Sequence, residues 1–579
     1  MTKLPAGEAI IKIMKAEGVR HVFGLPGGHI LPLYDGIYKT DGIEHILVRH
    51  EQSAANMAAA YAQLTGEPGV CIVTAGPGAT NLVTGIAEAF IGSLPIVVFA
   101  ARGATSTSQK GASQEIATDR IFAPITKWSI RVDRTDMIPD IARRAFTIAR
   151  GGKPGPVYVD LPRDLLPQEV EFGDYLPTAT RSAIAGDADL VRSATEALLG
   201  AKRPILVAGG GAVMSGAFDE VRQLAEMLAL PILTSLAGRG IIPDDHPMSV
   251  GGLGAHRNPL SKELFLCADC IIGVGTKFEE METNWRDGFL PDAHAVYVQI
   301  DIDAAEHGRS IVPRYPITGD ARTVLRQILS IVAKSGSALD AKAFAAHERV
   351  ARMRKAMAAI EAEAETIAGE NRVPIHALSV IRAARETFPR ETTIGIDVGC
   401  LAQHIAGAMP YFRIYQPRSL VVPSSFYGMG FVASGFPAAK LVYPDRPALC
   451  FVGDGSFQMV MNNLPTAVEH NLPVTWCVLN DGAYGSIRDI QTYVYGQRYL
   501  GTDLNVQPDF AKVAEANGCF GERIEASQDI AGAFGRALEA NKKGKPAVLD
   551  FAVGHDRMVQ STEFFTYFRG EMPGMTKKS

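Results

Sequence analysis

In the stretch Ala448-Leu449-Cys450-Phe451-Val452-Gly453-Asp454-Gly455-Ser456, a short apolar run is followed by a glycine-flanked aspartate and a serine. An uninterrupted apolar run of this length is typical of a strand buried on both faces of a parallel sheet. Ligands of open α/β sheets bind beyond the carboxyl ends of the strands, where this pattern places the polar residues. Glycines let an anion approach the backbone, Asp454 offers oxygen to a hard cation, and Ser456 offers a hydroxyl to phosphate. The stretch therefore predicts a parallel sheet with a ligand site at its edge.

A second oxygen-bearing turn follows the next predicted strand. The apolar run 474–479 ends in Asn480-Asp481-Gly482-Ala483-Tyr484-Gly485, and Asp481 lies 27 positions after Asp454. Because neighbouring parallel strands end at the same edge of a sheet, both carboxylates are expected at one place. Magnesium prefers octahedral oxygen coordination and usually shares it with phosphates and water. The pair of turns predicts a site for magnesium and a diphosphate.

The same alternation of short β-branched runs with longer helical patterns extends over the whole chain. Strand candidates fall in three series, at 69–74, 94–101 and 156–160, at 204–208, 270–274 and 295–302, and at 393–397, 447–452, 474–479 and 547–551. Such alternation indicates parallel sheets covered by helices. We predict an α/β protein of three doubly wound parallel-sheet domains at 1–175, 186–335 and 372–556, with a helical, solvent-exposed connection at 336–371 and a C-terminal tail at 557–579.

Composition excludes several classes of partner. The formal net charge of −5 gives no basic surface of the kind that binds phosphate backbones, so nucleic acid is not expected as a partner. The first 19 residues have the pattern of an amphipathic helix and lack the apolar core of a signal peptide. No run approaches the roughly 18 apolar residues that span a bilayer. We expect a cytoplasmic protein without a membrane partner.

The seven cysteines stand mostly beside Val, Ile or Leu, which indicates buried reduced thiols. Cys267 and Cys270 have C-x-x-C spacing, but a zinc site needs a second pair of ligands that this sequence does not supply nearby. Gly209-Gly210-Gly211 follows a predicted strand and leaves two interpretations open. The glycines belong either to a pyrophosphate-binding turn of a flavin or adenine nucleotide site, or to a tight strand-to-helix turn.

The spaced pair of turns resembles the signature of thiamine-diphosphate enzymes, in which G-D-G is followed about 27 residues later by N-N or N-D. By this resemblance Asp454 and Asp481 supply side-chain ligands to Mg²⁺, and Ala483 supplies its carbonyl. The family's second Asn is Asp481 here, which still offers oxygen. A coincidental pair of glycine turns is the alternative. The resemblance also implies cofactor contacts from Gly453, Gly455, Ser456, Tyr484, Gly485 and Ser486.

The segment Val48-Arg49-His50-Glu51-Gln52 is similar to the family's activating-glutamate segment. In that family a carboxylate protonates the pyrimidine ring of the cofactor and turns its amino group into a base. Taken alone, a Glu at a helix start is a favourable partner of the helix dipole. With both motifs present, the resemblance implies a site shared between the first and third domains. In this family the site lies between subunits, so a homodimer or homotetramer is implied.

Three further loops are similar to cofactor loops of the family. Gly76-Pro77-Gly78-Ala79-Thr80-Asn81 matches the pyrimidine loop, with contacts from Pro77 and Asn81. The diphosphate loop is matched by Val398-Gly399-Cys400-Leu401. Tyr427 and Met429 lie in the segment 424–430, where Met429 matches the large apolar residue that keeps the cofactor bent. An ordinary core methionine is the alternative there.

Within the superfamily, the chain is most similar to the acetolactate synthase group. The similar segments are 24–35, 43–52, 76–85, 453–459 and 471–474. The implied reaction is decarboxylation of a 2-oxo acid such as pyruvate, followed by carbon–carbon ligation to a second carbonyl compound. Intact Glu51, Asp454 and Asp481 argue against a non-catalytic, cofactor-binding paralogue.

Departures from that group keep other reactions open. His29 replaces a small residue of the synthases and resembles benzaldehyde lyase and some 2-oxo acid decarboxylases. It could shuttle protons near neutral pH, or it is a loop histidine with satisfied hydrogen bonds. Gln114 matches an active-site Gln shared by synthases and lyases. The alternative activity is therefore a 2-oxo acid decarboxylase, or a lyase that cleaves 2-hydroxy ketone or 2-hydroxyacyl substrates.

Other departures concern the acceptor and a second cofactor. Ser486 and Ile490 stand where synthases usually carry a large apolar residue and a Trp that helps to choose the acceptor. The flavin segment 251–256 is similar to the synthases, but 276–280 departs from the usual Arg-Phe-Asp-Asp-Arg pattern. FAD or an adenine nucleotide in the central domain is left open. The aromatic cluster 564–568 either folds over the site, as the carboxyl terminus can in this family, or forms a core helix.

Overall fold

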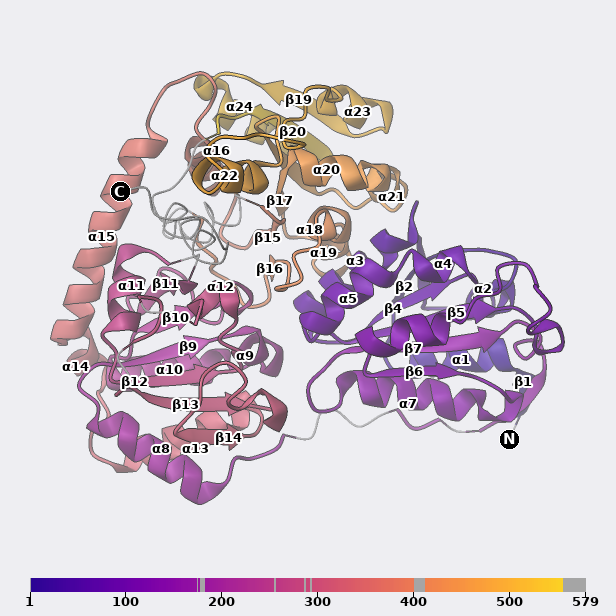
Figure 1. Ribbon diagram of the computed structural model, residues 1–579, viewed down its shortest axis with the longest axis horizontal. Helices are drawn as coiled ribbons and strands as arrows, with labels where there is room; N and C mark the ends of the chain where they lie inside the picture. Colours follow the sequence, from indigo (N-terminus) through magenta and orange to yellow (C-terminus); the bar gives the residue numbers. More distant parts are fainter. Residues whose placement is uncertain are drawn as a thin grey trace. The chain divides into compact units, whose positions relative to one another are not determined.

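The computed structural model describes residues 2–173, 175–177, 183–254, 257–285, 288–291, 294–399 and 412–555. It contains three six-stranded parallel sheets with helices around them, together with one two-stranded antiparallel pair (Figure 1). The prediction of an α/β protein with three parallel sheets is confirmed. The chain forms two compact units. The first unit comprises 1–182, 423–445 and 459–474, and the second comprises 183–422, 446–458 and 475–579.

The sheet of the first unit has the strand order β3-β2-β4-β5-β7-β6, and all its neighbours are parallel. Its strands are β2 (His21–Leu25), β3 (Glu44–Leu47), β4 (Gly69–Val73), β5 (Ile96–Arg102), β6 (Trp128–Arg131) and β7 (Pro156–Pro162). The helices of this unit are α1 (Ala6–Ala16), α2 (Leu31–Tyr38), α3 (Glu51–Thr65), α4 (Pro77–Thr80), α5 (Val83–Ile91), α6 (Thr118–Phe122), α7 (Ile138–Arg150), α18 (Phe431–Gly435), α19 (Ala438–Val442) and α21 (Leu464–Glu469).

The amino terminus differs from the predicted helix over 1–19. Residues 2–5 form β1 (Thr2–Pro5), which pairs antiparallel with β8 (Glu169–Phe172), and α1 begins only at Ala6. Proline cannot stand inside a helix without loss of a hydrogen bond, so Pro5 marks the helix start. The pairing with β8 and the burial of Leu4 account for the extended residues before it.

Helix α3 lies inside the first unit rather than on its surface. Its alanine-rich sequence buries residues on all sides, and Gly66 ends it with φ of +79°. Small residues let other elements come close to it. Asn56 on α3 donates a hydrogen bond of 2.8 Å to the Ser434 hydroxyl on α18, and both side chains are buried. The close packing fixes the position of the helix whose first residue is Glu51.

The second unit contains two sheets. The central sheet has the order β11-β10-β9-β12-β13-β14, and the C-terminal sheet has the order β16-β15-β17-β18-β20-β19. The central strands are β9 (Pro204–Ala208), β10 (Ile232–Thr234), β11 (Ser249–Gly252), β12 (Cys270–Val274), β13 (Val296–Asp301) and β14 (Tyr315–Thr318). The C-terminal strands are β15 (Thr393–Ile396), β16 (Leu420–Val421), β17 (Ala448–Gly453), β18 (Thr475–Asn480), β19 (Phe520–Ile524) and β20 (Ala547–Ala552).

Helices accompany both sheets (Figure 1). Those in the central part are α8 (Ala188–Gly200), α9 (Gly210–Ser215), α10 (Phe218–Leu228), α11 (Pro259–Leu266), α12 (Glu280–Thr283) and α13 (Ala321–Lys334). The C-terminal part has α16 (Ala377–Thr387), α20 (Asp454–Val460), α22 (Gly485–Tyr493), α23 (Phe510–Ala516) and α24 (Ile530–Lys542). Between the two parts lie α14 (Ala341–Ala346) and α15 (Glu348–Ala368), in the stretch predicted to be helical. The domain boundaries given above stay predictions.

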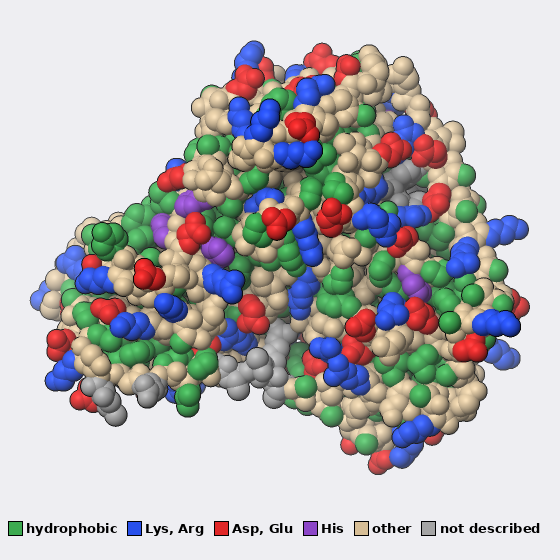
Figure 2. All heavy atoms as spheres, turned by 180° about the vertical axis from the view of Figure 1, so that it is seen from behind, with side chains coloured by type: hydrophobic (Ala, Val, Ile, Leu, Met, Phe, Trp, Pro, Cys, Tyr) green, Lys and Arg blue, Asp and Glu red, His purple; other side chains and the backbone are tan. Residues whose placement is uncertain are grey.

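The expectation that the cysteines are buried thiols is confirmed for most, but not all, of those that the structure describes. Cys71, Cys270, Cys450, Cys477 and Cys519 are buried free thiols, whereas Cys267 is exposed, so the expectation of burial is wrong for that residue. Cys400 lies outside the described residues. Figure 2 shows Lys and Arg side chains interspersed with Asp and Glu over the face drawn there. Among the helices that the structure describes, none is both long and apolar enough to cross a membrane.

We expect Gly69→Ala to destabilise the first unit. A Cβ atom at Gly69 would lie 2.2 Å from the Ala58 carbonyl oxygen of α3, so the helix would have to move away from β4. Overpacking of this kind costs about 1–3 kcal/mol, and the thermal melting midpoint should fall. Gly200→Ala is the matched control, because a Cβ there meets nothing within 4 Å. An unchanged midpoint for Gly69→Ala would contradict the packing described.

Candidate active site

Glu51 is the first residue of α3 and is buried, with 6% of its surface exposed. Its Oε2 atom accepts a hydrogen bond of 2.8 Å from the Asn81 side-chain amide. A Cβ atom at Gly78 would lie 3.4 Å from Glu51 Oε1 and 2.7 Å from Thr74 Cγ2, so this close approach of the loop depends on glycine. The structure thus brings the predicted activating glutamate together with the loop that carries Pro77 and Asn81.

The strand that leads to Glu51 is held by side chains of distant residues. Leu47 ends the edge strand β3, whose outer backbone groups need partners from outside the sheet. The Leu47 amide donates to His470 Nε2 at 2.9 Å, and the Thr466 hydroxyl donates to the Leu47 carbonyl at 3.0 Å. Arg49 also donates to the carboxylate of Glu469. Helix α21 therefore fixes the backbone just before Glu51.

A partly buried tyrosine–histidine pair lies in the same unit. The Tyr34 hydroxyl and His45 Nε2 are 3.0 Å apart, and the ring centroids are 4.8 Å apart, edge to face. Burial lowers the pKa of His45 to about 4, and the neighbouring His470 acts in the same direction. Burial raises the pKa of Tyr34, and the charge of Glu51 adds to that increase. Tyr34 therefore lies within electrostatic reach of the Glu51 carboxylate.

The structure also brings His29 and Gln114 together. Burial lowers the pKa of His29 and the charge of Arg163 adds to this, while a hydrogen bond with Gln114 opposes the shift. Gln114 has φ of +61°, and a Cβ atom at Gly76 would lie 2.9 Å from Gln114 Cβ. The pair therefore adjoins the loop that contacts Glu51. A lowered pKa keeps the imidazole neutral near pH 7, in the form that accepts a proton.

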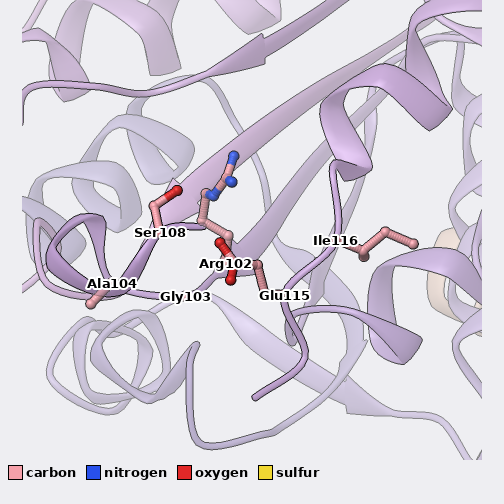
Figure 3. A pocket seen from close by; sticks show the side chains of 6 residues that line it. All are labelled: Arg102, Gly103, Ala104, Ser108, Glu115 and Ile116. Atoms are coloured by element: carbon pink, nitrogen blue, oxygen red, sulfur yellow. The ribbon is translucent and has the colours of Figure 1, made fainter. Parts of the chain in front are cut away.

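A small pocket lies in the same unit and is lined in part by Glu115, the residue after Gln114. Its lining residues are Arg102, Gly103, Ala104, Ser108, Glu115 and Ile116, which Figure 3 shows around the end of β5. Arg102 donates to Asp160 Oδ2 at 3.0 Å. Burial raises the pKa of Asp160 to about 7, against the opposing charge of Arg102. The pocket thus has a cation, a carboxylate and a hydroxyl in its lining, from Arg102, Glu115 and Ser108.

In the second unit, Asp454 and Asp481 follow the neighbouring strands β17 and β18. Asp454 is 1% exposed. Burial raises its pKa to about 7, and the charge of Asp481 acts in the same direction. Each carboxylate also has a polar neighbour, because Gln507 donates to Asp454 and His555 Nδ1 lies 3.0 Å from Asp481 Oδ2. A buried Asp454 carboxylate beside the partly buried carboxylate of Asp481 is a donor set that a divalent cation would stabilise.

The turn after Asp481 is clamped by a later segment. Leu504 N donates to the Gly482 carbonyl at 2.7 Å, and Tyr484 N donates to the Thr502 carbonyl at 2.8 Å. These bonds lie on either side of Ala483 and do not use its carbonyl. A Cβ atom at Gly455 would lie 2.7 Å from the Tyr484 ring, so the two turns touch through a glycine.

This donor set fits magnesium with a diphosphate, since hard oxygen atoms come from two carboxylates and a backbone carbonyl. Among the described residues no group of three or more His, Cys, Asp or Glu side chains could hold a metal ion. A site with two protein carboxylates needs further oxygen from phosphate or water. Gly399 has φ of +124° and would place a Cβ 3.9 Å from the Ser486 hydroxyl, so the loop of Val398 and Gly399 adjoins the same turn.

The remaining predicted site residues are placed as follows. Cys400, Leu401 and the tail 557–579 lie outside the described residues. Tyr427 and Met429 belong to the first unit, where Gly428 N donates to Glu88 at 2.9 Å. Met429 is half-buried rather than a core residue. Gly453 ends β17, Ser456 lies on α20, and Gly485, Ser486 and Ile490 lie on α22.

The glycine turn of the central sheet is closely packed. Gly209 N donates to the Val274 carbonyl at 2.9 Å, and Gly211 N donates to the Gly275 carbonyl at 3.0 Å. A Cβ atom at Gly209 would lie 2.2 Å from the Gly275 carbonyl oxygen. Two of the three amides are thus engaged with the backbone of the neighbouring strand end. This geometry favours the tight-turn interpretation over a pyrophosphate site.

Sequence reasoning missed Tyr34, His45, Thr466 and His470. Thr466 and His470 contact Leu47 from more than 400 positions away, and no motif singles out Tyr34 or His45. Only the short spacing of Tyr34 and His45 from Glu51 could have drawn attention to two of them.

We expect His45 to make stability depend on pH. Its pKa is about 4 in the folded protein and 6.5 when unperturbed, so the unfolded chain binds the proton more tightly. Stability is then greatest above about pH 6.5 and falls by up to about 3 kcal/mol as the pH decreases to 4. His45→Gln should flatten that decrease in denaturant unfolding curves. Parallel pH profiles for the variant and the wild type would contradict the assignment.

Comparison with known proteins identifies the family. Thiamine pyrophosphate enzyme models match in three parts: the N-terminal TPP binding domain at 5–121, the central domain at 191–328, and the C-terminal TPP binding domain at 397–551. The acetolactate synthase isozyme 3 large subunit of Escherichia coli is 34% identical, with 96% of this chain and 95% of that protein covered. The acetolactate synthase large subunit of Haemophilus influenzae is 34% identical over 94% of each chain. A probable acetolactate synthase large subunit of Methanococcus aeolicus is also 34% identical, over 94% and 91%. The chain therefore belongs to the thiamine pyrophosphate enzymes and is a thiamine-diphosphate-dependent carboligase of the acetolactate synthase-like group.

Proposed function

We propose that this enzyme decarboxylates a 2-oxo acid of the pyruvate type and joins the remaining fragment to a second carbonyl compound. The observation that carries the proposal is the buried Glu51 carboxylate, bonded to Asn81 beside Gly78. It occurs in a chain similar over nearly its full length to proteins named acetolactate synthase. We expect the substrates to be small 2-oxo acids, aldehydes or ketones.

Thiamine diphosphate supplies a carbon nucleophile and an electron sink when bound. We assign Mg²⁺ binding to Asp454, Asp481 and the Ala483 carbonyl, and diphosphate binding to the turns at 453–456 and 484–486 with the loop 398–401. The proposed pyrimidine contacts are Pro77, Asn81, Tyr427 and Met429. Asn81 holds Glu51 Oε2 by its hydrogen bond, which leaves Oε1 to carry and release the activating proton.

The two halves of the proposed site belong to different units, with Glu51 in the first and both aspartates in the second. We propose that they come from two subunits of a homodimer or homotetramer, as the family resemblance implies. We propose no flavin or adenine nucleotide site at the glycine turn, because the amides of Gly209 and Gly211 donate to backbone carbonyls instead.

A second candidate reaction is supported by His29 and Gln114. A neutral histidine bonded to a glutamine can accept or return a proton at the reacting centre. This favours a decarboxylase, or a lyase that cleaves a 2-hydroxy ketone or a 2-hydroxyacyl compound. Product analysis separates the candidates after incubation with thiamine diphosphate, Mg²⁺ and pyruvate. Acetolactate supports ligation and acetaldehyde supports decarboxylation, whereas absence of pyruvate turnover contradicts the first proposal.

We expect Glu51→Gln to lower turnover at least about 100-fold, since it removes the proton donor but retains the shape of the side chain. Steady-state rates with saturating cofactor measure the effect, and cofactor binding should persist. Glu539→Gln is the control, because Glu539 is an exposed carboxylate on α24 whose ion-pair partner is Lys542 of the same helix. Equal, measurable rates for Glu51→Gln and wild type would overturn the assigned role, whereas absence of turnover in both proteins would support a non-catalytic cofactor-binding protein.

A further inference from the structure

The C-terminal sheet contains an ionisable side chain in its apolar interior. Asp550 lies within β20 and is fully buried, between Leu549 and Phe551, which belong to the hydrophobic core. Burial raises the pKa of Asp550, and its hydrogen bonds oppose that shift. A carboxylate in such a place is costly unless each oxygen has a partner.

Partners come from the strands on both sides of β20. Asn480 at the end of β18 donates to Asp550 Oδ1 at 3.0 Å, and Arg523 on β19 donates to Oδ2 at 2.7 Å. Register explains the alignment. Asp550 is paired with Arg523 on one side and with Val478 on the other, and Asn480 follows Val478 by two residues. Residues two apart on a strand point to the same face, so the three side chains form one row across the sheet.

The row ends at the turn that carries Asp481. Because the Asp550 carboxylate accepts hydrogen bonds and does not donate them, it fixes which end of the Asn480 amide faces it. The Asn480 carbonyl oxygen is thereby turned toward the next residues, where it accepts from Gly482 N at 3.3 Å. Gly482 has φ of +70°, a conformation that needs glycine or a local constraint. Asn480 thus shapes the backbone between Asp481 and Ala483.

We propose that Arg523, Asp550 and Asn480 are positioning residues that orient the turn of Asp481 and Ala483 for metal binding. This inference rests on the proposed magnesium site. A fold that needed only stability would gain little here, because replacing a buried ion pair by apolar residues is often neutral or stabilising. The row differs from an ordinary core contact because it links an edge strand to the turn that offers two of the three assigned ligands. Side chains that orient metal ligands typically change metal affinity when replaced.

The experiment measures Mn²⁺ binding by electron paramagnetic resonance in the presence of thiamine diphosphate, with the full-length protein. Asn480→Leu removes both hydrogen bonds of the amide, and Arg523→Gln removes the charge at the partly exposed end of the row. We expect each to raise the half-saturating Mn²⁺ concentration by about 10- to 100-fold. Arg523→Lys, which keeps the charge beside Asp550, should recover part of the affinity.

Arg536→Gln is the matched control. Arg536 forms an exposed ion pair with Glu522 of the same edge strand, and this pair does not contact the turn. Its Mn²⁺ affinity should equal that of wild type. Melting midpoints of the metal-free proteins are recorded in parallel, and Arg523→Gln serves if Asn480→Leu does not fold.

Lowered midpoints with unchanged Mn²⁺ affinity in Asn480→Leu and Arg523→Gln would overturn the inference, because the row would then be a structural contact alone. Failure of the proposed function is distinguishable, since wild-type protein would then bind no Mn²⁺ with thiamine diphosphate. That result would overturn the metal site and this inference together.

Discussion

The ends of two neighbouring parallel strands bring Asp454 and Asp481 to one edge of a sheet, where their charges oppose each other. Strand register makes this unavoidable, because β17 and β18 pair residue by residue up to Gly453 and Leu479. Burial of Asp454 and the nearby charge of Asp481 together raise the pKa of Asp454 to about 7. The surrounding structure is arranged around these two carboxylates. Segment 502–504 clamps one turn, Gly455 lets the Tyr484 ring pack against the other, and Gln507 donates to Asp454.

A comparable constraint acts on Glu51 in the first unit. The carboxylate is useful only if it stays buried, oriented and free to exchange a proton. Asn81 orients it, Gly78 lets the segment after Gly76 approach it, and α21 holds the strand that precedes it. Helix α21 follows soon after the turn of Asp454 in sequence, yet belongs to the first unit. Only a few residues therefore connect Asp454 to Thr466, which belong to different units.

The sequence predicted the parts of the fold that have strong local signals. Ten strand candidates correspond to β4, β5, β7, β9, β12, β13, β15, β17, β18 and β20, because long apolar runs are typical of strands buried on both faces. Short or edge strands such as β3, β10 and β16 have too few apolar residues to form a run. The helix expected over 1–19 was wrong at its start, since pairing with β8 comes from residues more than 160 positions away.

The same distinction holds for the site. Glu51, Asp454 and Asp481 could be named because spaced motifs mark them. His470 and Thr466 could not, because each contacts Leu47 from more than 400 positions along the chain. Asp550 is set in an apolar run that looks like any buried strand, and its partners depend on the register of three strands.

The central claim is that Glu51 activates a thiamine diphosphate held by the two aspartates. Deuterium exchange at the thiazolium C2–H of the bound cofactor, followed by NMR, tests it most directly, because it reports activation without any substrate. The account predicts exchange far faster than for free cofactor in the wild type, and a return toward the free rate in Glu51→Gln with the cofactor still bound. Fast exchange in Glu51→Gln would contradict it.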